Sequence, residues 1–226
     1  MFTAIENYFE KNKSIFLYFI IFFVAWTLRV YFLSPLITFD NELIQRLINE
    51  GLRVAIWAIP PFLYLMYFDL VENPLKALKI TSEIDWKNTL VYTFLGLAYV
   101  AGGIAVQVFF FHQKLVPASV GNIFVFLLNF VSLPLIEELT FRGFILEKLA
   151  TTHKLWVAIV FQAFLFMLMH VPGWVMLRGL TPLFFKDLAG VFILGIIFGY
   201  IAKKSNSVLP ATVVHAINNL LVGYLV

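Results

Sequence analysis

The sequence predicts an all-α fold: a polytopic integral membrane helical bundle of about seven or eight transmembrane helices. The first observation is composition, since 62% of the residues are hydrophobic, 13% are charged, and the mean hydropathy is +0.91. The second is that long apolar runs alternate with short polar segments. The third is that no segment reads as a soluble domain, so residues 1–226 form a single integral membrane domain.

A transmembrane helix needs about 20 mostly apolar residues. Scanning for such runs gives seven segments, at roughly 15–34, 52–70, 89–111, 119–147, 155–171, 184–201 and 206–226. The stretch "VPGWVMLRGLTPLFF" between the fifth and sixth segments could contain a further short helix, which would bring the count to eight.

Several residues refine the individual segments. No small-residue cleavage site follows the first run, so we expect it to remain as a span, with Arg29 near its end reaching out to the interface. Pro60 and Pro61 should kink the second span. Gly195 and Gly199 form a small-x-x-x-small pair that favours close helix packing. The five tryptophans fall mainly near predicted span ends, as interfacial anchors do.

Charge and cysteine content narrow the function classes. The chain has a net charge of +3, but its basic residues lie singly or in pairs between apolar runs, which indicates membrane topology rather than a nucleic-acid partner. With seven spans, more basic loop residues lie on the side of the membrane that holds the amino terminus than on the other side. This excess predicts a cytoplasmic amino terminus. The absence of cysteine excludes disulfides, thiolate metal sites and thiol nucleophiles. The abundance of Phe, Ile and Asn suggests a prokaryotic cell membrane.

Charged residues inside the fourth run need an explanation, because each is costly at membrane depth. In "LIEELTFRGF", Glu138 and Arg142 are four residues apart on a helix and can form an ion pair. Glu137 points about 100° away and has no such local partner, so it is the carboxylate that could serve as a general base. The alternative is that all three residues form a buried ionic staple between helices.

Two histidines extend this polar set. Counted from the predicted helix ends, Glu137, His170 and His215 lie about 20, 22 and 14 Å deep, so they could share a layer. A lone intramembrane histidine more often makes a helix-to-helix hydrogen bond. However, His215 and Asn219 are four residues apart and project from the same helical face, whereas Asn218 points toward a neighbouring helix.

Two chemistries fit these residues. In the first, Glu137 deprotonates a water assisted by His170, while His215 and Asn219 donate hydrogen bonds to the developing oxyanion. In the second, Glu137, His170 and His215 bind a Zn²⁺ ion that activates the water. Both lead to hydrolysis of a peptide bond, with a peptide or protein substrate reached from the lipid bilayer.

The motifs resemble those of the CPBP family, the type II CAAX prenyl endopeptidases and bacteriocin-processing (Abi) intramembrane proteases. The matching positions are Glu137, Glu138 and Arg142, then Phe166 and His170, then His215 and Asn219. The tail "GVFILGIIFGYIAKKSNSVLPATVVHAINN" is similar to that family as well. The resemblance covers residues 122–223 as a protease core and leaves 1–121 as additional transmembrane helices.

The resemblance implies a polar cavity inside the bilayer and gives each motif residue a role. Glu137 matches the acid that activates water, and Glu138 with Arg142 matches its supporting pair. His170 matches the histidine beside the water, and His215 with Asn219 the final motif, assigned to oxyanion stabilisation or metal support. The competing class is a non-catalytic membrane protein, for example an immunity protein, that uses the same polar cluster to bind an ion or a partner.

Overall fold

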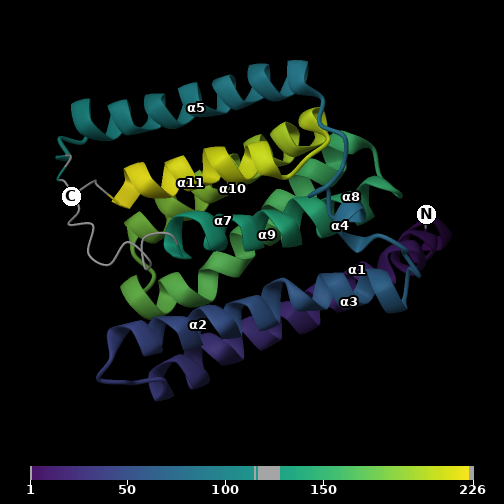
Figure 1. Ribbon diagram of the computed structural model, residues 1–226, viewed down its shortest axis with the longest axis horizontal. Helices are drawn as coiled ribbons and strands as arrows, with labels where there is room; N and C mark the ends of the chain where they lie inside the picture. Colours follow the sequence, from purple (N-terminus) through teal and green to yellow (C-terminus); the bar gives the residue numbers. More distant parts are fainter. Residues whose placement is uncertain (1, 115, 117–127, 224–226) are drawn as a thin grey trace. The chain divides into compact units, whose positions relative to one another are not determined.

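The computed structural model describes residues 2–114, 116 and 128–223, and the regular secondary structure of these residues is entirely helical, which confirms the predicted all-α class. The elements are α1 (Phe2–Leu28), η1 (Arg29–Leu33), η2 (Ser34–Leu36), α2 (Glu42–Trp57), α3 (Ile59–Tyr67), α4 (Pro74–Ala77), α5 (Trp86–Phe109), η3 (Leu128–Ser132), α7 (Leu133–Glu138), η4 (Leu139–Leu146), α8 (Glu147–Ala150), α9 (Leu155–Arg178), α10 (Pro182–Ser205) and α11 (Leu209–Gly223) (Figure 1). The start of the span predicted at 119–147 lies outside the described residues.

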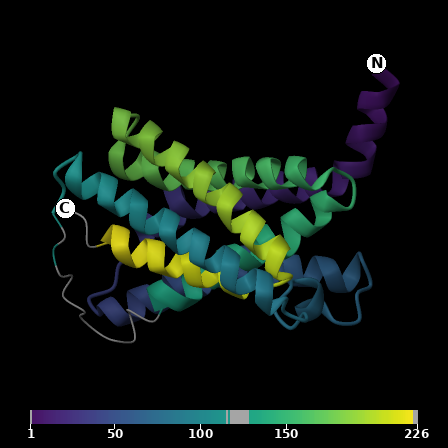
Figure 2. The ribbon, with the colours of Figure 1, turned by 90° about the horizontal axis from the view of Figure 1, so that it is seen from above.

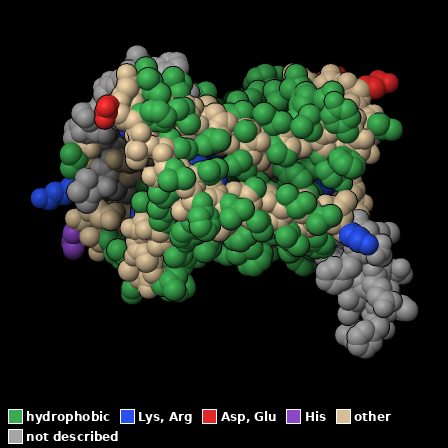
Figure 3. Space-filling view, turned by 90° about the horizontal axis from the view of Figure 1, so that it is seen from below, with side chains coloured by type: hydrophobic (Ala, Val, Ile, Leu, Met, Phe, Trp, Pro, Cys, Tyr) green, Lys and Arg blue, Asp and Glu red, His purple; other side chains and the backbone are tan. Residues whose placement is uncertain are grey.

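Four helical stretches of the described residues are long and apolar enough to cross a membrane, and Leu209–Gly223 is a shorter apolar helix. The four are Lys13–Leu36, Trp86–Phe109, Leu155–Arg178 and Pro182–Ser205, which correspond to the first, third, fifth and sixth predicted spans. Their outer faces are apolar: Phe94 is 70% exposed and Ile21 is 61% exposed. Hydrophobic side chains also make up most of the coloured surface in Figure 3. Such a surface is suited to lipid, and the chain is an integral membrane protein.

Prolines and a glycine determine where several helices begin and end. The second predicted span is divided into α2 and α3 at Ala58, because Pro60 and Pro61 lack the N–H groups of a helix interior and are tolerated in the first turn of α3. The suggested separate helix after the fifth span is wrong. Helix α9 instead continues through Pro172 to Arg178, and the chain leaves it at Gly179, whose φ of 65° favours glycine.

The chain divides into two compact units. Unit 1 comprises Met1–Tyr64 and Phe144–Ile196, and unit 2 comprises Leu65–Gly143 and Ile197–Val226.

Unit 1 has an aromatic core in which α1 packs against α2 and α9. The Trp57 ring lies edge-on to Phe22 at 5.2 Å and to Trp26 at 5.0 Å, and it is only 2% exposed. The Trp26 indole N–H donates to the Met169 carbonyl at 3.1 Å. The prediction that the tryptophans are interfacial anchors is therefore wrong for these two, because each is buried among partners inside the unit.

Two other predictions fall within unit 1. Gly195 does allow close packing of α10, since a Cβ atom there would lie 2.9 Å from the Cβ of Ala163 on α9. At the same place the Gln162 amide donates to the Gly195 carbonyl at 2.9 Å. The Arg29 side chain does not extend outward as expected. It is 8% exposed and donates to Asn49 at 2.6 Å, because α2 offers it a polar partner.

Unit 2 contains α5, α7, the first part of η4, the last part of α10 and α11. Helix α11 lies along α5, as both Figure 1 and Figure 2 show, and it also packs against α7. Gly96 makes the contact between α5 and α11 close, because a Cβ atom at this position would lie 3.2 Å from a methyl of Val214. This packing brings together the first and the last of the three predicted motifs, which begin on α7 and lie on α11.

Candidate active site

The two acids lie at the end of α7, which has a π-helical segment on each side. η3 precedes α7, η4 follows it, and Pro134 in the first turn of α7 lacks the N–H of a regular helix. Single π-helical turns within α-helices frequently occur at functional sites. Glu137 is 8% exposed and Glu138 is fully buried. The local sequence therefore presents both carboxylates to the interior of unit 2.

The predicted ion pair between Glu138 and Arg142 is confirmed. Arg142 Nη1 donates to Glu138 Oε1 at 3.0 Å, and both side chains have 0% exposure. A buried charge without a partner would be strongly destabilising, so the pairing explains how these residues are tolerated at this depth.

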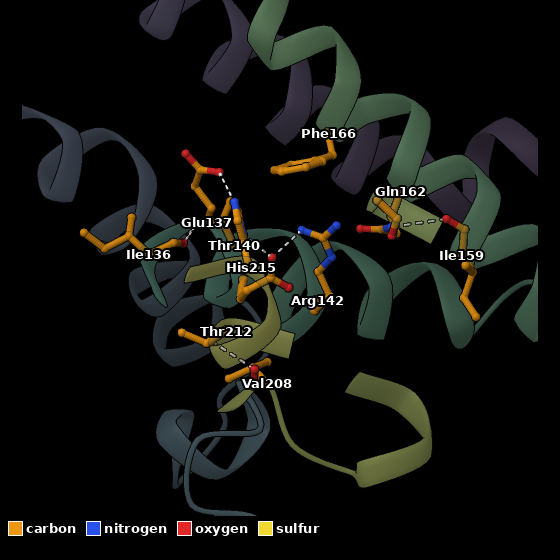
Figure 4. A network of polar contacts seen from close by, with 12 residues as sticks. Ile136, Glu137, Thr140, Arg142, Ile159, Gln162, Phe166, Val208, Thr212 and His215 are labelled. Carbon is orange, nitrogen blue, oxygen red and sulfur yellow. Dashed lines mark hydrogen bonds and ion pairs between the residues drawn. The ribbon is translucent and has the colours of Figure 1, made fainter. Parts of the chain in front are cut away.

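His215 lies between the two acids (Figure 4). Its Nδ1 is 2.8 Å from Glu138 Oε1, and its Nε2 is 3.7 Å from Glu137 Oε2. An ionised carboxylate can only accept hydrogen bonds, so Nδ1 carries a proton and donates a hydrogen bond to Glu138. This arrangement directs Nε2 toward Glu137.

Sequence reasoning missed the bond between His215 and Glu138. It gave Glu138 only Arg142 as a partner and assigned His215 to a pair with Asn219. No local signal could have revealed the bond, because the two residues are 77 positions apart.

Phe198 on α10 is a further residue of the cluster that sequence reasoning missed. Its ring stacks on the His215 imidazole with a centroid distance of 4.9 Å and an interplanar angle of 23°. The Arg142 guanidinium lies 5.3 Å from the centre of the same ring, close enough for a cation–π interaction. The buried phenyl group covers one face of the imidazole and excludes water from the charges, which strengthens their interaction.

Residues 78–85, which we call the clamp loop, contact the elements that carry the cluster. Gly143 follows Arg142 directly, and a Cβ atom at this position would lie 2.5 Å from the Leu78 carbonyl oxygen. At the start of α11, the Val208 N–H donates to the Lys79 carbonyl at 3.1 Å. The clamp loop therefore contacts both η4, which follows the two acids, and the start of α11, which carries His215.

The turn between α10 and α11 is fixed to the clamp loop mainly by Asn206. Its side-chain amide donates to the Glu83 carbonyl at 2.9 Å and accepts from Lys79 Nζ at 2.9 Å. The Ser82 hydroxyl donates to the Asn206 carbonyl. Asn206 has a φ of 52°, a left-handed conformation that asparagine adopts more readily than most residues. These contacts determine where α11 begins.

Asn219 lies one helical turn after His215 on α11, as predicted. The Asn218 amide donates to Asn219 Oδ1 in a long bond of 3.4 Å. This bond uses the oxygen of Asn219, so the N–H groups of Asn219 are the part of the side chain suited to an anionic oxygen.

His170 lies on α9 in unit 1. Its Nδ1 is 2.9 Å from the Phe166 carbonyl oxygen, which only accepts, so Nδ1 carries a proton and donates a hydrogen bond to this oxygen. The rings of Phe166 and Trp174 lie edge-on to it at 4.8 and 5.2 Å. The motif pair Phe166 and His170 therefore forms a local unit with a defined imidazole orientation.

The predicted Zn²⁺ ligands were Glu137, His170 and His215. In unit 2, Glu137 and His215 provide two donors, whereas catalytic zinc sites use three protein ligands. No group of three or more His, Cys, Asp or Glu side chains able to hold a metal ion occurs among the described residues. Neither unit by itself provides a three-ligand set among its described residues.

The cluster and the motifs lie within one segment that resembles a known family. Residues 119–221 match the model of the type II CAAX prenyl endopeptidase Rce1-like family. The resemblance indicated by the motifs is thereby confirmed for residues 119–221. This segment includes every predicted site residue from Glu137 to Asn219. No curated protein and no solved structure matches the chain.

Proposed function

We propose that the protein is an intramembrane endopeptidase in which Glu137 activates the water that hydrolyses a peptide bond. The observation that carries this proposal is the short distance, 3.7 Å, between Glu137 Oε2 and His215 Nε2. The other two charged groups, Glu138 and Arg142, are already paired with each other. Glu137 is the carboxylate that remains for proton transfer.

A distance of 3.7 Å is too long for a direct hydrogen bond, but a water beside the pair could lie about 2.8 Å from both atoms. Glu137 takes a proton from this water, and the hydroxide attacks the carbonyl carbon of the scissile bond. The resulting oxyanion accepts hydrogen bonds from the Asn219 amide and from a protonated His215 Nε2. The C–N bond then breaks, and the proton held by Glu137 passes to the leaving amine.

The formal charges of the cluster support a protonated His215 in this step. Glu137 and Glu138 contribute two negative charges and Arg142 one positive charge. A protonated His215 would make the cluster neutral, and its Nε2 would then be a donor. Glu138 and Arg142 act as positioning residues, because the bond from Nδ1 to Glu138 orients the imidazole. In the same proposal, His170 assists the water.

The match to the CAAX prenyl endopeptidase model supports a substrate of the CAAX type. A second candidate is another peptide processed at the membrane, such as a bacteriocin precursor. We further propose a prokaryotic cell membrane with the amino terminus in the cytoplasm. Residues 122–223 would then form the protease core, and the preceding helices would be an addition to it.

The test compares peptide termini in membranes of cells that express the wild type, Glu137→Gln or Glu72→Gln at equal levels. Glu72 is an exposed loop residue and is the matched control. New termini are expected with the wild type and the control, and Glu137→Gln should lower their rate of appearance by about 100-fold to 10,000-fold. Identical termini in all three samples would instead favour an immunity or binding protein.

The same substrates then test the metal alternative. Cleavage by purified enzyme should persist after treatment with a chelator, because the proposed water is activated by a carboxylate. Loss of cleavage that Zn²⁺ restores would contradict this mechanism and leave the peptidase assignment intact.

A further inference from the structure

A second polar cluster lies in unit 1 and has no part in the proposed hydrolysis. It consists of Trp26, Arg29, Asn49, Glu50 and Arg53, which we call the Arg29 cluster. Arg29 begins the π-helical segment η1 inside the candidate span Lys13–Leu36. Its guanidinium donates to the neutral Asn49 side chain at 2.6 Å, so this bond does not compensate its charge. A charged side chain inside a span marks a candidate functional site.

The cluster contains one more positive charge than negative charge. Arg53 donates twice to the Glu50 carboxylate, at 2.8 and 3.0 Å, and this pair is neutral. The charged groups that act electrostatically on Arg29 are Arg53 and Glu50. The cluster therefore contains two guanidinium groups and one carboxylate, which is bonded to Arg53, and a buried excess charge requires a counter-charge.

Arg29 and Arg53 both lie beside one aromatic ring, that of Trp26. Their guanidinium carbons lie 5.0 and 6.0 Å from the centre of the Trp26 ring. The ring attracts both cations but does not neutralise them. In addition, Arg29 Nε is buried and has no hydrogen-bond acceptor within the described part of the chain.

Helix α2 turns its polar face inward. Its outward residues are apolar, with Ile44, Leu47 and Val54 exposed by 45%, 43% and 38%. The side chains of Glu50 and Arg53 are 15% and 18% exposed. A purely structural link between η1 and α2 would need one hydrogen bond, and the bond between Arg29 and Asn49 provides it. Such a link would explain neither the second guanidinium group nor the excess positive charge.

We propose that the Arg29 cluster binds an anionic phosphate group and that the occupant is the headgroup of an anionic membrane lipid. Guanidinium groups bind phosphate oxygens in pairs with good geometry. Arg29 lies seven residues before the end of the span at Leu36, or about 10 Å along a helix, which places it within reach of the headgroup layer. Nearby Phe32 and Leu33 are 64% and 45% exposed and offer apolar contacts for acyl chains.

The test measures thermal unfolding of the full chain in neutral detergent micelles with added phosphatidylglycerol, phosphatidylcholine or inorganic phosphate. Phosphatidylglycerol should raise the unfolding temperature, and phosphatidylcholine should have a smaller effect. A rise with inorganic phosphate as well would support the phosphate site and identify free phosphate as a second source. No rise with either phosphatidylglycerol or inorganic phosphate would overturn the proposal.

Variants show whether the response belongs to this cluster. Arg53→Gln removes a positive charge, and Arg29→Lys keeps the charge but loses the planar guanidinium group. Each variant should weaken the apparent affinity for phosphatidylglycerol about tenfold. The control Lys87→Gln removes an exposed positive charge from unit 2 and should keep the wild-type response. Equal weakening in the control, or none in either arginine variant, would overturn the proposal. The result is independent of whether Glu137 is catalytic.

Discussion

The two nitrogens of the His215 ring face different carboxylates, and this asymmetry distinguishes the two acids. Glu138 is tied to Arg142 and to Nδ1, whereas Glu137 faces Nε2. Adjacent residues of the same type thus have different roles because of their partners. The stability of the cluster should depend on the pair of Glu138 and Arg142 more than on Glu137.

Removing Arg142 should leave the buried carboxylate of Glu138 without its guanidinium partner and the cluster with one positive charge fewer. We expect Arg142→Met to lower the free energy of unfolding by about 3–5 kcal/mol. Adding Glu138→Gln to this variant should recover part of the loss, because glutamine is neutral and still accepts from His215. Unfolding in mixed micelles measures both variants. A double variant as unstable as the single one would contradict the role of the charge pair.

Single residues could be predicted from the sequence where their partners are local. The pair of Glu138 and Arg142 follows from a spacing of four residues on a helix. The contacts of His215 with Glu138 and with Phe198 depend on packing between helices and carry no local signal. The prediction for Arg29 was wrong for the same reason, since Asn49 lies 20 residues away on α2.

At the scale of elements, the clamp loop is the feature that aligns α7 and η4 with α11. It meets Gly143 through the Leu78 carbonyl and meets α11 through the Lys79 carbonyl. The sequence pattern marks this stretch only as a polar connection between two predicted spans, because its backbone contacts depend on no recognisable motif.

The close contact at Gly143 gives a direct test of the clamp loop. We expect Gly143→Ala to lower the free energy of unfolding by about 1–3 kcal/mol, because its methyl group would overlap the Leu78 carbonyl. The control is Gly102→Ala in α5, which meets nothing within 4 Å. It should be neutral or stabilising by up to about 1 kcal/mol. Similar results for the two variants would show that the contact is unimportant.

Helix α5 begins at a capping residue with a pH-dependent effect. Asp85 accepts from the Asn88 backbone N–H at 3.1 Å and from its side-chain amide at 2.7 Å, and these bonds lower the pKa of Asp85. Because the folded-state pKa is lowered, the stabilisation is present above the unfolded-state pKa and is lost as pH falls through the folded-state pKa.

Unfolding temperatures measured across acidic pH test this cap. Asp85→Ala should be less stable than the wild type at neutral pH, and the difference should shrink as the pH falls through the folded-state pKa of Asp85. Asp85→Asn keeps a capping oxygen without a titrating charge, so its difference in stability from Asp85→Ala should stay constant over the same pH range. A constant difference between Asp85→Ala and the wild type would contradict the assigned cap.

At the scale of the whole molecule, the apolar outer faces of the helices indicate a lipid environment. Composition and run length predicted this class and the positions of the four long helices. The same signals could not show that Pro60 and Pro61 divide one span, or that π-helical segments border α7. Hydropathy reports how apolar a segment is and does not report its local hydrogen bonding.

A charge on a lipid-facing position should impair membrane insertion. Phe94 on α5 is 70% exposed and lies inside the span Trp86–Phe109. We expect Phe94→Asp to disfavour insertion by about 2.5–3.5 kcal/mol, and Phe94→Leu to insert normally. The fraction of protein that resists carbonate extraction measures the effect. Equal fractions for the two variants would contradict a lipid-facing position.

The clamp loop also determines which fragment of the chain is large enough to form the candidate site. The matched family segment starts at residue 119, whereas the carbonyls that contact Gly143 and Val208 belong to residues 78 and 79. A fragment restricted to the family segment would lack these partners and should not assemble the Glu138–His215 contact by itself. Supplying residues 65–118 as a separate polypeptide should restore it, so the smallest self-sufficient form of the site is larger than its sequence motifs.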